Sequence, residues 1–116
     1  MIAVIFEVFP KEDKKLEYLQ LAADMRPLVE QMDGFIKVER FQSLTDPSKL
    51  LSISYFENDA AVERWRKLSK HRKMQTKGRN EIFDGYNIKV LQVIRDYGMK
   101  DRDEAPEDSK ENIKGS

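Results

Sequence analysis

MIAVIFEVF, residues 1–9, decides the fold because apolar side chains occupy both of its alternating faces. Valine, isoleucine and phenylalanine favour extended backbone, and successive side chains of a strand point to opposite faces of a sheet. Four apolar side chains share one face and three share the other: Ile2, Val4, Phe6 and Val8 against Ala3, Ile5 and Phe9. A sheet built on this strand therefore needs apolar cover on both sides.

The sequence after this strand predicts a helix and then two paired strands. Apolar residues recur at helical spacing from about residue 12 to residue 32, at Tyr18, Leu21, Met25, Leu28 and Met32. Asp33-Gly34 is typical of a helix end, and residues 35–44 then predict a strand. Asp46-Pro47 indicates a turn, so residues 49–57 are expected to pair antiparallel with that strand.

A second helix and a fourth strand complete the order. Asn58-Asp59 supplies an N-cap for a helix that we expect to run to about Lys77 and to end at Gly78. Residues 86–97 alternate and predict a strand. The order β-α-β-β-α-β is that of an α+β, ferredoxin-like fold, in which a four-stranded antiparallel sheet carries both helices on one face.

The second apolar face of residues 1–9 predicts a partner. Leaving such a face in water would forfeit about 25 cal/mol for each Å² of apolar surface. We therefore expect a homodimer in which the open sheet faces of two copies cover one another. The alternative is a monomer whose second sheet face is merely less polar than average.

Composition limits the possible functions. The chain of 116 residues has no cysteine and one histidine, which exclude disulfides, a thiol nucleophile, Cys-ligated zinc and a multi-histidine metal site. No run approaches the roughly 20 apolar residues of a membrane helix, and residues 1–9 lead into a charged run rather than a signal-peptide cleavage site. We expect a cytoplasmic protein with no membrane partner.

The charged residues after Gly98 predict a change in organisation. Residues 1–97 are expected to form one domain, whereas residues 98–116 contain no aromatic residue and a single isoleucine. Such a segment buries too little apolar surface to offset its ordering entropy. The sequence predicts a disordered, solvated tail, with a short helix docked on a partner subunit as the alternative.

The stretch ERWRKLSKHRKMQTKGR, residues 63–79, holds the only tryptophan, the only histidine and eight basic residues. In helical projection Trp65 and Arg72 lie on the inward stripe, His71 lies on its flank and most of the lysines face water. Nucleic-acid binding is not expected, because the basic face carries no aromatic stacking platform.

Each of the three inward or flanking residues has two interpretations. Trp65 is either a core residue or a pocket wall, and His71 is either a hydrogen-bonded structural group or a base. Arg72 either forms an ion pair from helix to sheet or binds an anion. The candidate partners for the ion pair are Glu7, Glu39 and Glu57.

Two segments resemble the antibiotic biosynthesis monooxygenase superfamily of small dimeric α+β barrels: DGFIKVERFQSLTDPSKLLSISYFENDAAVERWRKLSKHRKMQTKGR, residues 33–79, and YNIKVLQVIRDY, residues 86–97. The resemblance covers residues 1–97. Its most specific parts are Gly34-Phe35, Trp65 and His71-Arg72. It implies the ferredoxin-like fold and the homodimer.

The resemblance also implies a function. It is that of a cofactor-independent monooxygenase, which oxidises a small phenolic or quinol-type substrate with O2 in a pocket between the second helix and the sheet. Trp65 and His71 match a tryptophan and a polar ring that line this pocket in such members. His71 would take the proton of the substrate, and Arg72 or Arg64 would stabilise the resulting anion. No metal or other cofactor is implied.

Two alternatives stay open. One is a non-catalytic dimer that binds a small ligand or serves in stress. The other is a haem-binding or haem-degrading protein, which the resemblance also includes. The haem-degrading pattern uses an asparagine on the first strand, whereas no asparagine precedes Asn58 here, and it expects a longer interval than that from Trp65 to His71.

Overall fold

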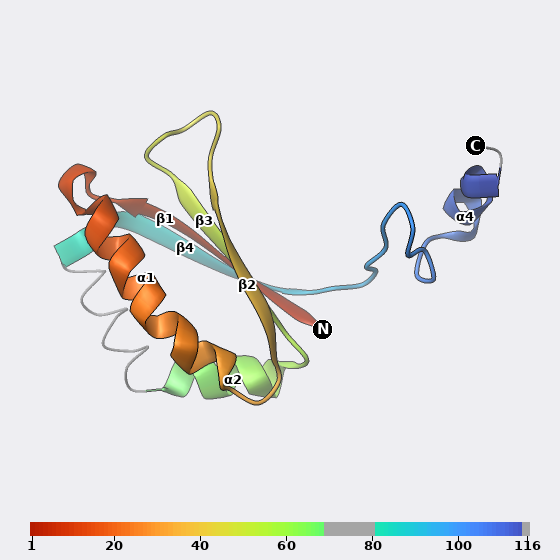
Figure 1. The fold of residues 1–116 in the computed structure, drawn as a ribbon, viewed down its shortest axis with the longest axis horizontal. Helices are drawn as coiled ribbons and strands as arrows, with labels where there is room; N and C mark the ends of the chain where they lie inside the picture. The colour runs from red at the N-terminus through yellow and green to blue at the C-terminus, as the bar shows by residue number, and fades with distance from the viewer. Residues whose placement is uncertain (69–80, 115–116) are drawn as a thin grey trace.

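The structure is a computed structural model that describes residues 1–68 and 81–114. Four antiparallel strands form one sheet in the order β2-β3-β1-β4, made of β1 (Ile2–Pro10), β2 (Phe35–Gln42), β3 (Leu50–Phe56) and β4 (Phe83–Gln92). A 3-10 turn (Glu12–Lys14) leads into α1 (Lys15–Glu30), and α2 (Asp59–Lys67) follows β3. Both helices cover the same face of the sheet (Figure 1). The predicted ferredoxin-like α+β fold is confirmed, and the sheet is open.

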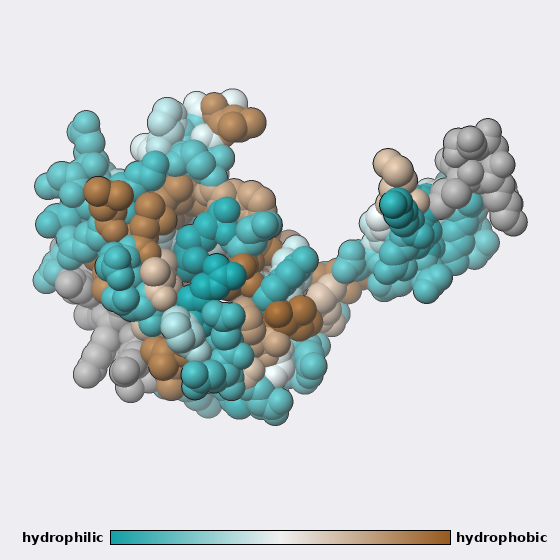
Figure 2. All heavy atoms as spheres, in the orientation of Figure 1, coloured by the Kyte–Doolittle hydropathy of each residue, from teal (hydrophilic) through white to brown (hydrophobic). Residues whose placement is uncertain are grey.

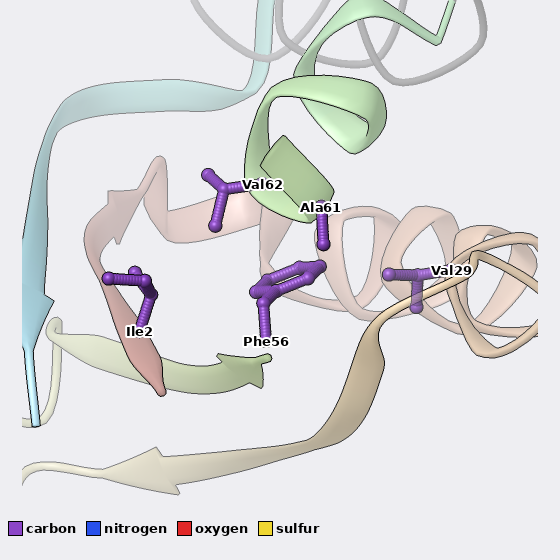
Figure 3. Close-up of a cluster of buried hydrophobic side chains, with 5 residues drawn as sticks. All are labelled: Ile2, Val29, Phe56, Ala61 and Val62. Atoms are coloured by element: carbon purple, nitrogen blue, oxygen red, sulfur yellow. The ribbon is translucent and has the colours of Figure 1, made fainter. Parts of the chain in front are cut away.

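Two apolar clusters hold the helices on the sheet, one at each end of β1. The first contains Ile2, Val29, Phe56, Ala61 and Val62. Phe56 lies at its centre, with side chains of both helices around the ring (Figure 3). The second contains Val8, Tyr18, Leu50, Ile82 and Phe83. The middle of the helix-covered face therefore lies between two packed ends.

The turn at Gly34 joins α1 to β2 and packs closely against α2. Gly34 has a φ of 88°, and a Cβ at this position would lie 2.6 Å from the Cβ of Ala61. Its carbonyl oxygen accepts a hydrogen bond of 2.7 Å from the Glu57 amide. The Asn58 side chain accepts a hydrogen bond of 3.0 Å from the Ala61 amide, so the predicted N-cap is confirmed.

The second helix is shorter than predicted. It ends at Lys67, and Leu68 has extended backbone angles, φ −65° and ψ 127°. A Glu63–Lys67 ion pair of 2.7 Å supports the last turn, but the following sequence to residue 79 has no acidic residue. Residues 69–80, with the predicted end at Gly78, lie outside the described residues.

The fourth strand begins earlier than the sequence predicts. β4 starts at Phe83 and ends at Gln92, whereas the alternating pattern suggested residues 86–97. Asp84-Gly85 resembles a turn signal, but here a register shift between Phe9 and Pro10 accommodates it within the ladder. Gly85 pairs with Phe9 and the buried Phe83 with Pro10. The bulge therefore continues the strand where the composition predicts a break.

The chain after β4 leaves the sheet as an arm that ends in α4 (Glu107–Lys114) (Figure 1). The arm is mainly hydrophilic (Figure 2). The Arg102 guanidinium donates hydrogen bonds to the carbonyls of Gly98 at 3.1 Å and Ser109 at 2.7 Å, and it lies 5.4 Å from the centre of the Tyr97 ring. This segment contains the short helix that was the alternative to a disordered tail, and its docking on a partner stays a prediction.

Candidate functional site

A cavity of about 270 Å³ lies between the two helices and the helix-covered face of the sheet. It occupies the middle of that face, between the two apolar clusters. All four strands and both helices contribute to its wall. The described residues that line it are Val4, Phe6, Tyr18, Ala22, Met25, Arg26, Val29, Val38, Arg40, Ser52, Ser54, Phe56, Val62, Trp65, Arg66, Phe83, Ile88 and Val90.

Small residues on β3 account for the space. Ser52 lies opposite Phe6 of β1, and Ser54 lies opposite Val4. A sheet face that packs under helices usually carries large apolar side chains, which fill such a position. Two hydroxymethyl groups at the centre of the face leave that volume empty. The cavity therefore follows directly from the sequence SIS at residues 52–54.

The charged groups of the cavity are all positive. Three arginines line it, Arg26, Arg40 and Arg66, and no aspartate or glutamate does so among the described residues. Arg26 lies at an exposed position and forms an ion pair of 3.5 Å with Glu30. A largely apolar cavity with guanidinium groups on its wall favours a ligand that carries negative charge.

Arg40 and Tyr18 lie next to each other in this wall. Tyr18 is 2% exposed, and its burial raises the pKa of the phenol above the usual value of 10.0, an effect that the adjacent Arg40 partly opposes. Arg40 is half-buried, and its Nε is buried without a hydrogen-bond partner in the described part of the chain. A buried donor without an acceptor costs stability, so the polar groups of this part of the wall are incompletely satisfied.

The residues that the sequence singles out are distributed unequally. Trp65 lines the cavity from α2. Arg64 donates a hydrogen bond of 3.1 Å to the Asp33 carbonyl, and it is not among the described lining residues. His71 and Arg72 lie outside the described residues.

Two of the partners suggested for Arg72 lie on the open face of the sheet, which the helices do not cover. Phe6 and Arg40 line the cavity, so their neighbours Glu7 and Glu39 point to the open face. The Glu7 carboxylate lies 2.8 Å from Lys49 Nζ and 2.6 Å from Lys89 Nζ. Hydrogen bonds from these two lysines lower the pKa of Glu7 to about 2. Glu7 therefore forms an ion-paired cluster on the face that the helices leave uncovered.

Sequence reasoning missed Tyr18, Arg40, Ser52 and Ser54 as site residues. A signal for three of them was present, because Arg40 follows Val38 by two positions and the two serines alternate with apolar residues. Strand alternation then puts Arg40 on the same face as Val38, and it puts the two serines on the face opposite to their apolar neighbours. The choice between the two faces required the register between strands, which the sequence does not contain.

Within residues 1–68 and 81–114, no three His, Cys, Asp or Glu side chains come together as metal ligands. In the same residues, no helix has the length and apolar character needed to cross a membrane.

Comparison with known proteins places this architecture in a family. The family model described as antibiotic biosynthesis monooxygenase matches residues 1–77. A protein of Pyricularia oryzae named jasmonate monooxygenase ABM is 38% identical over 93 residues, which are 80% of this chain but only 43% of that protein. The protein YqjZ of Bacillus subtilis, which is uncharacterized, is 28% identical over 93 residues, 79% of its length.

A solved structure shares the fold. Rv0793 from Mycobacterium tuberculosis superimposes with a TM-score of 0.75 at 15% identity, over 84% of this chain and 98% of that one. Its likeness concerns the fold alone, whereas the family match rests on sequence and covers most of the sheet and both helices. The chain belongs to the antibiotic biosynthesis monooxygenase family.

Proposed function

We propose that this protein is a cofactor-independent monooxygenase that oxidises a small phenolic or quinol-type substrate with O2 in the cavity between the helices and the sheet. The observation that carries the proposal is the cavity of about 270 Å³, which has an apolar wall, one tryptophan and three arginines, in a chain of this family. Cavities of this size and character are typical of sites for small organic molecules.

The proposed reaction needs no external reductant. A phenol with a free para position loses four electrons when it becomes a quinone. One atom of O2 enters the ring, and the other leaves as water together with the two hydrogens that the phenol gives up. Because the substrate supplies every electron, the protein has to bind the ring, remove a proton and stabilise the anion. Trp65 is suited to pack against the ring, and His71 remains our predicted base.

We further infer that the working unit is a homodimer joined through the open sheet face. Proteins of this family are typically dimers. The open face carries Ile5, Leu51 and Ile53 at its centre, and Phe41 and Leu91 toward its edges are 45% and 41% exposed. Burial of these side chains against a second copy would remove apolar surface from water.

Oxygen consumption tests the enzymatic proposal. The purified chain is supplied with a panel of phenols and hydroquinones, together with jasmonate because of the name of the Pyricularia oryzae relative. We expect uptake of O2 with at least one phenolic substrate and its loss in Ser54→Leu, which fills the cavity. Ser48→Leu, an exposed serine in the β2–β3 turn, is the matched control and should retain the activity.

Further outcomes of the oxygen-uptake experiment distinguish the other possible functions and sites. His71→Ala should lower the rate if this residue is the base, and an unchanged rate would assign proton removal elsewhere. Absence of uptake across the panel by correctly folded protein would overturn the monooxygenase proposal and favour a ligand-binding dimer. Equal uptake by Ser54→Leu and the native chain would show that the reaction does not take place in the cavity.

A further inference from the structure

We propose that Arg40 is the anion-binding residue of the cavity and that the molecule bound there is an aromatic monocarboxylate. For turnover this inference rests on the proposed function, but for binding it stands on the cavity alone. The family comparison and the sequence patterns assign no role to Arg40. The proposal follows from the charge of the wall, from the position of Arg40 and from the distribution of apolar surface.

The charged side chains that line the described part of the cavity are all cationic, which favours an anionic ligand. Three guanidinium groups and no carboxylate line the cavity among the described residues. The adjoining residues 69–80 contain no aspartate or glutamate in their sequence, so they cannot supply one. Of the two arginines besides Arg40, Arg26 already pairs with Glu30. A positive, largely apolar enclosure excludes cations and favours a single anionic group.

Arg40 is the group best placed to receive that anion. It lines the cavity at a half-buried position beside the Tyr18 phenol, and no carboxylate pairs with it among the described residues. A tyrosine whose pKa is raised by burial stays neutral at neutral pH and leaves the guanidinium charge uncompensated. A carboxylate matches the planar fork of a guanidinium and accepts two parallel hydrogen bonds from it.

The apolar part of the wall indicates what kind of group is attached to the carboxylate of the ligand. Tyr18 packs in the cluster at the Val8 end of β1, whereas Trp65 packs against the cluster at the Ile2 end. The anion site and the tryptophan thus lie toward opposite ends of the cavity. A ligand that places its carboxylate on Arg40 directs its apolar body toward Trp65. This arrangement favours an aromatic ring separated from the carboxylate by a short aliphatic chain.

Calorimetric titration with a matched pair of ligands tests the inference without any turnover. The probes are 3-phenylpropanoate and its neutral isostere 3-phenylpropanamide, which differ in charge but hardly in shape. We expect the native protein to bind the carboxylate at least about tenfold more tightly than the amide, since hydrogen bonds to charged groups contribute that much. Arg40→Met should abolish this preference, and Arg40→Lys, which keeps the charge but not the fork, should retain part of it.

Lys14→Met is the matched control, because it removes a positive charge that has a carboxylate partner, Glu17, and lies outside the described cavity wall. It should leave the preference within about twofold, and circular dichroism should show native secondary structure in every variant. Equal binding of the two ligands by the native protein would overturn the inference. Loss of the preference in Lys14→Met but not in Arg40→Met would overturn it as well.

A turnover arm separates this inference from the proposed function. The substrates are 3-(3-hydroxyphenyl)propanoate and the corresponding amide, a phenol with a free para position, with and without the carboxylate. A charge preference in binding without O2 uptake from either substrate would support the role of Arg40 and contradict the monooxygenase. Uptake from both substrates at the same KM, unchanged in Arg40→Met, would support the monooxygenase and contradict the role of Arg40.

Discussion

At the scale of single residues, Gly34 combines two constraints that no other amino acid meets. Its φ of 88° lies in the left-handed region, and an added Cβ would approach the Cβ of Ala61 to 2.6 Å. The contact partner is a helix side chain without rotatable bonds, so α2 itself would have to move.

We predict that Gly34→Ala lowers the free energy of unfolding by about 1–3 kcal/mol, the usual cost of a strained backbone position. Urea unfolding followed by circular dichroism measures the change. Gly85→Ala is the control, because nothing lies within 4 Å of its added Cβ and its φ is not positive. An equal loss in both variants would contradict this explanation.

Glu7 predicts a pH dependence of stability. Two lysines lower its pKa from 4.5 to about 2, so folding favours the ionised carboxylate. The contribution is complete above pH 4.5 and disappears as the pH falls toward 2. We expect Glu7→Gln to have a lower Tm than the native chain at pH 7, and the difference to shrink as the pH approaches 2.

Thermal unfolding across this pH range provides the measurement. Glu39→Gln is the control, since Glu39 is an exposed carboxylate of the same sheet face for which the described residues show no ion pair. A difference between Glu7→Gln and the native chain that stays constant from pH 7 to pH 2 would contradict a role for the ionised form.

The sequence indicates some of these residues more clearly than others. Gly34 follows an aspartate at the end of a helical pattern, and Trp65 is unique, so both attract notice. Arg40 and the two serines have ordinary neighbours, and their importance depends on which strand lies beside which. His71 and Arg72 were chosen from a helical projection, and both lie outside the described residues.

At the scale of secondary-structure elements, apolar periodicity located every strand and both helices of the domain, because burial on one side imposes it. The ends of the elements were less predictable. The start of β4 depends on a bulge against Pro10, which is a contact between segments rather than a local propensity. α2 ends at Lys67, earlier than the sequence predicted.

The N-cap of α2 yields a prediction at this scale. Asn58→Ala removes the acceptor of the Ala61 amide and should lower the free energy of unfolding by about 0.5–2 kcal/mol. Chemical denaturation measures the loss. Asn58→Asp, which keeps an oxygen at the same position, should restore most of the stability, and a loss as large as that of Asn58→Ala would contradict a capping role.

At the scale of the whole molecule, the helices cover one sheet face and leave the other open (Figure 1). The strand MIAVIFEVF carries apolar side chains on both faces, and for this reason the sequence predicts a homodimer without any knowledge of the register. Within one copy of the chain, the helices cover only one of these two apolar faces. The course of the arm was not predictable in the same way, because its contacts through Arg102 connect residues of a strongly charged segment.

We predict that the native chain sediments at twice its mass of 13.6 kDa and that Ile53→Glu shifts it toward the monomer. Ile53 lies at the centre of the open face, paired with Ile5, so a charge there would have to be buried in the dimer. Leu16→Glu, at a position on α1 that is 82% exposed, is the control and should remain dimeric. A native chain that sediments as a monomer at micromolar concentration would contradict the dimer.

The position of Trp65 has a practical consequence for anyone who studies this protein. It is the only tryptophan of the chain, and its indole borders the space in which we expect ligands to bind. Excitation of that single chromophore therefore reports on one place in the molecule, with no background from other indoles. An emission shift on addition of a candidate compound gives a label-free reading of occupancy, and it allows chemical libraries to be screened before any reaction has been observed.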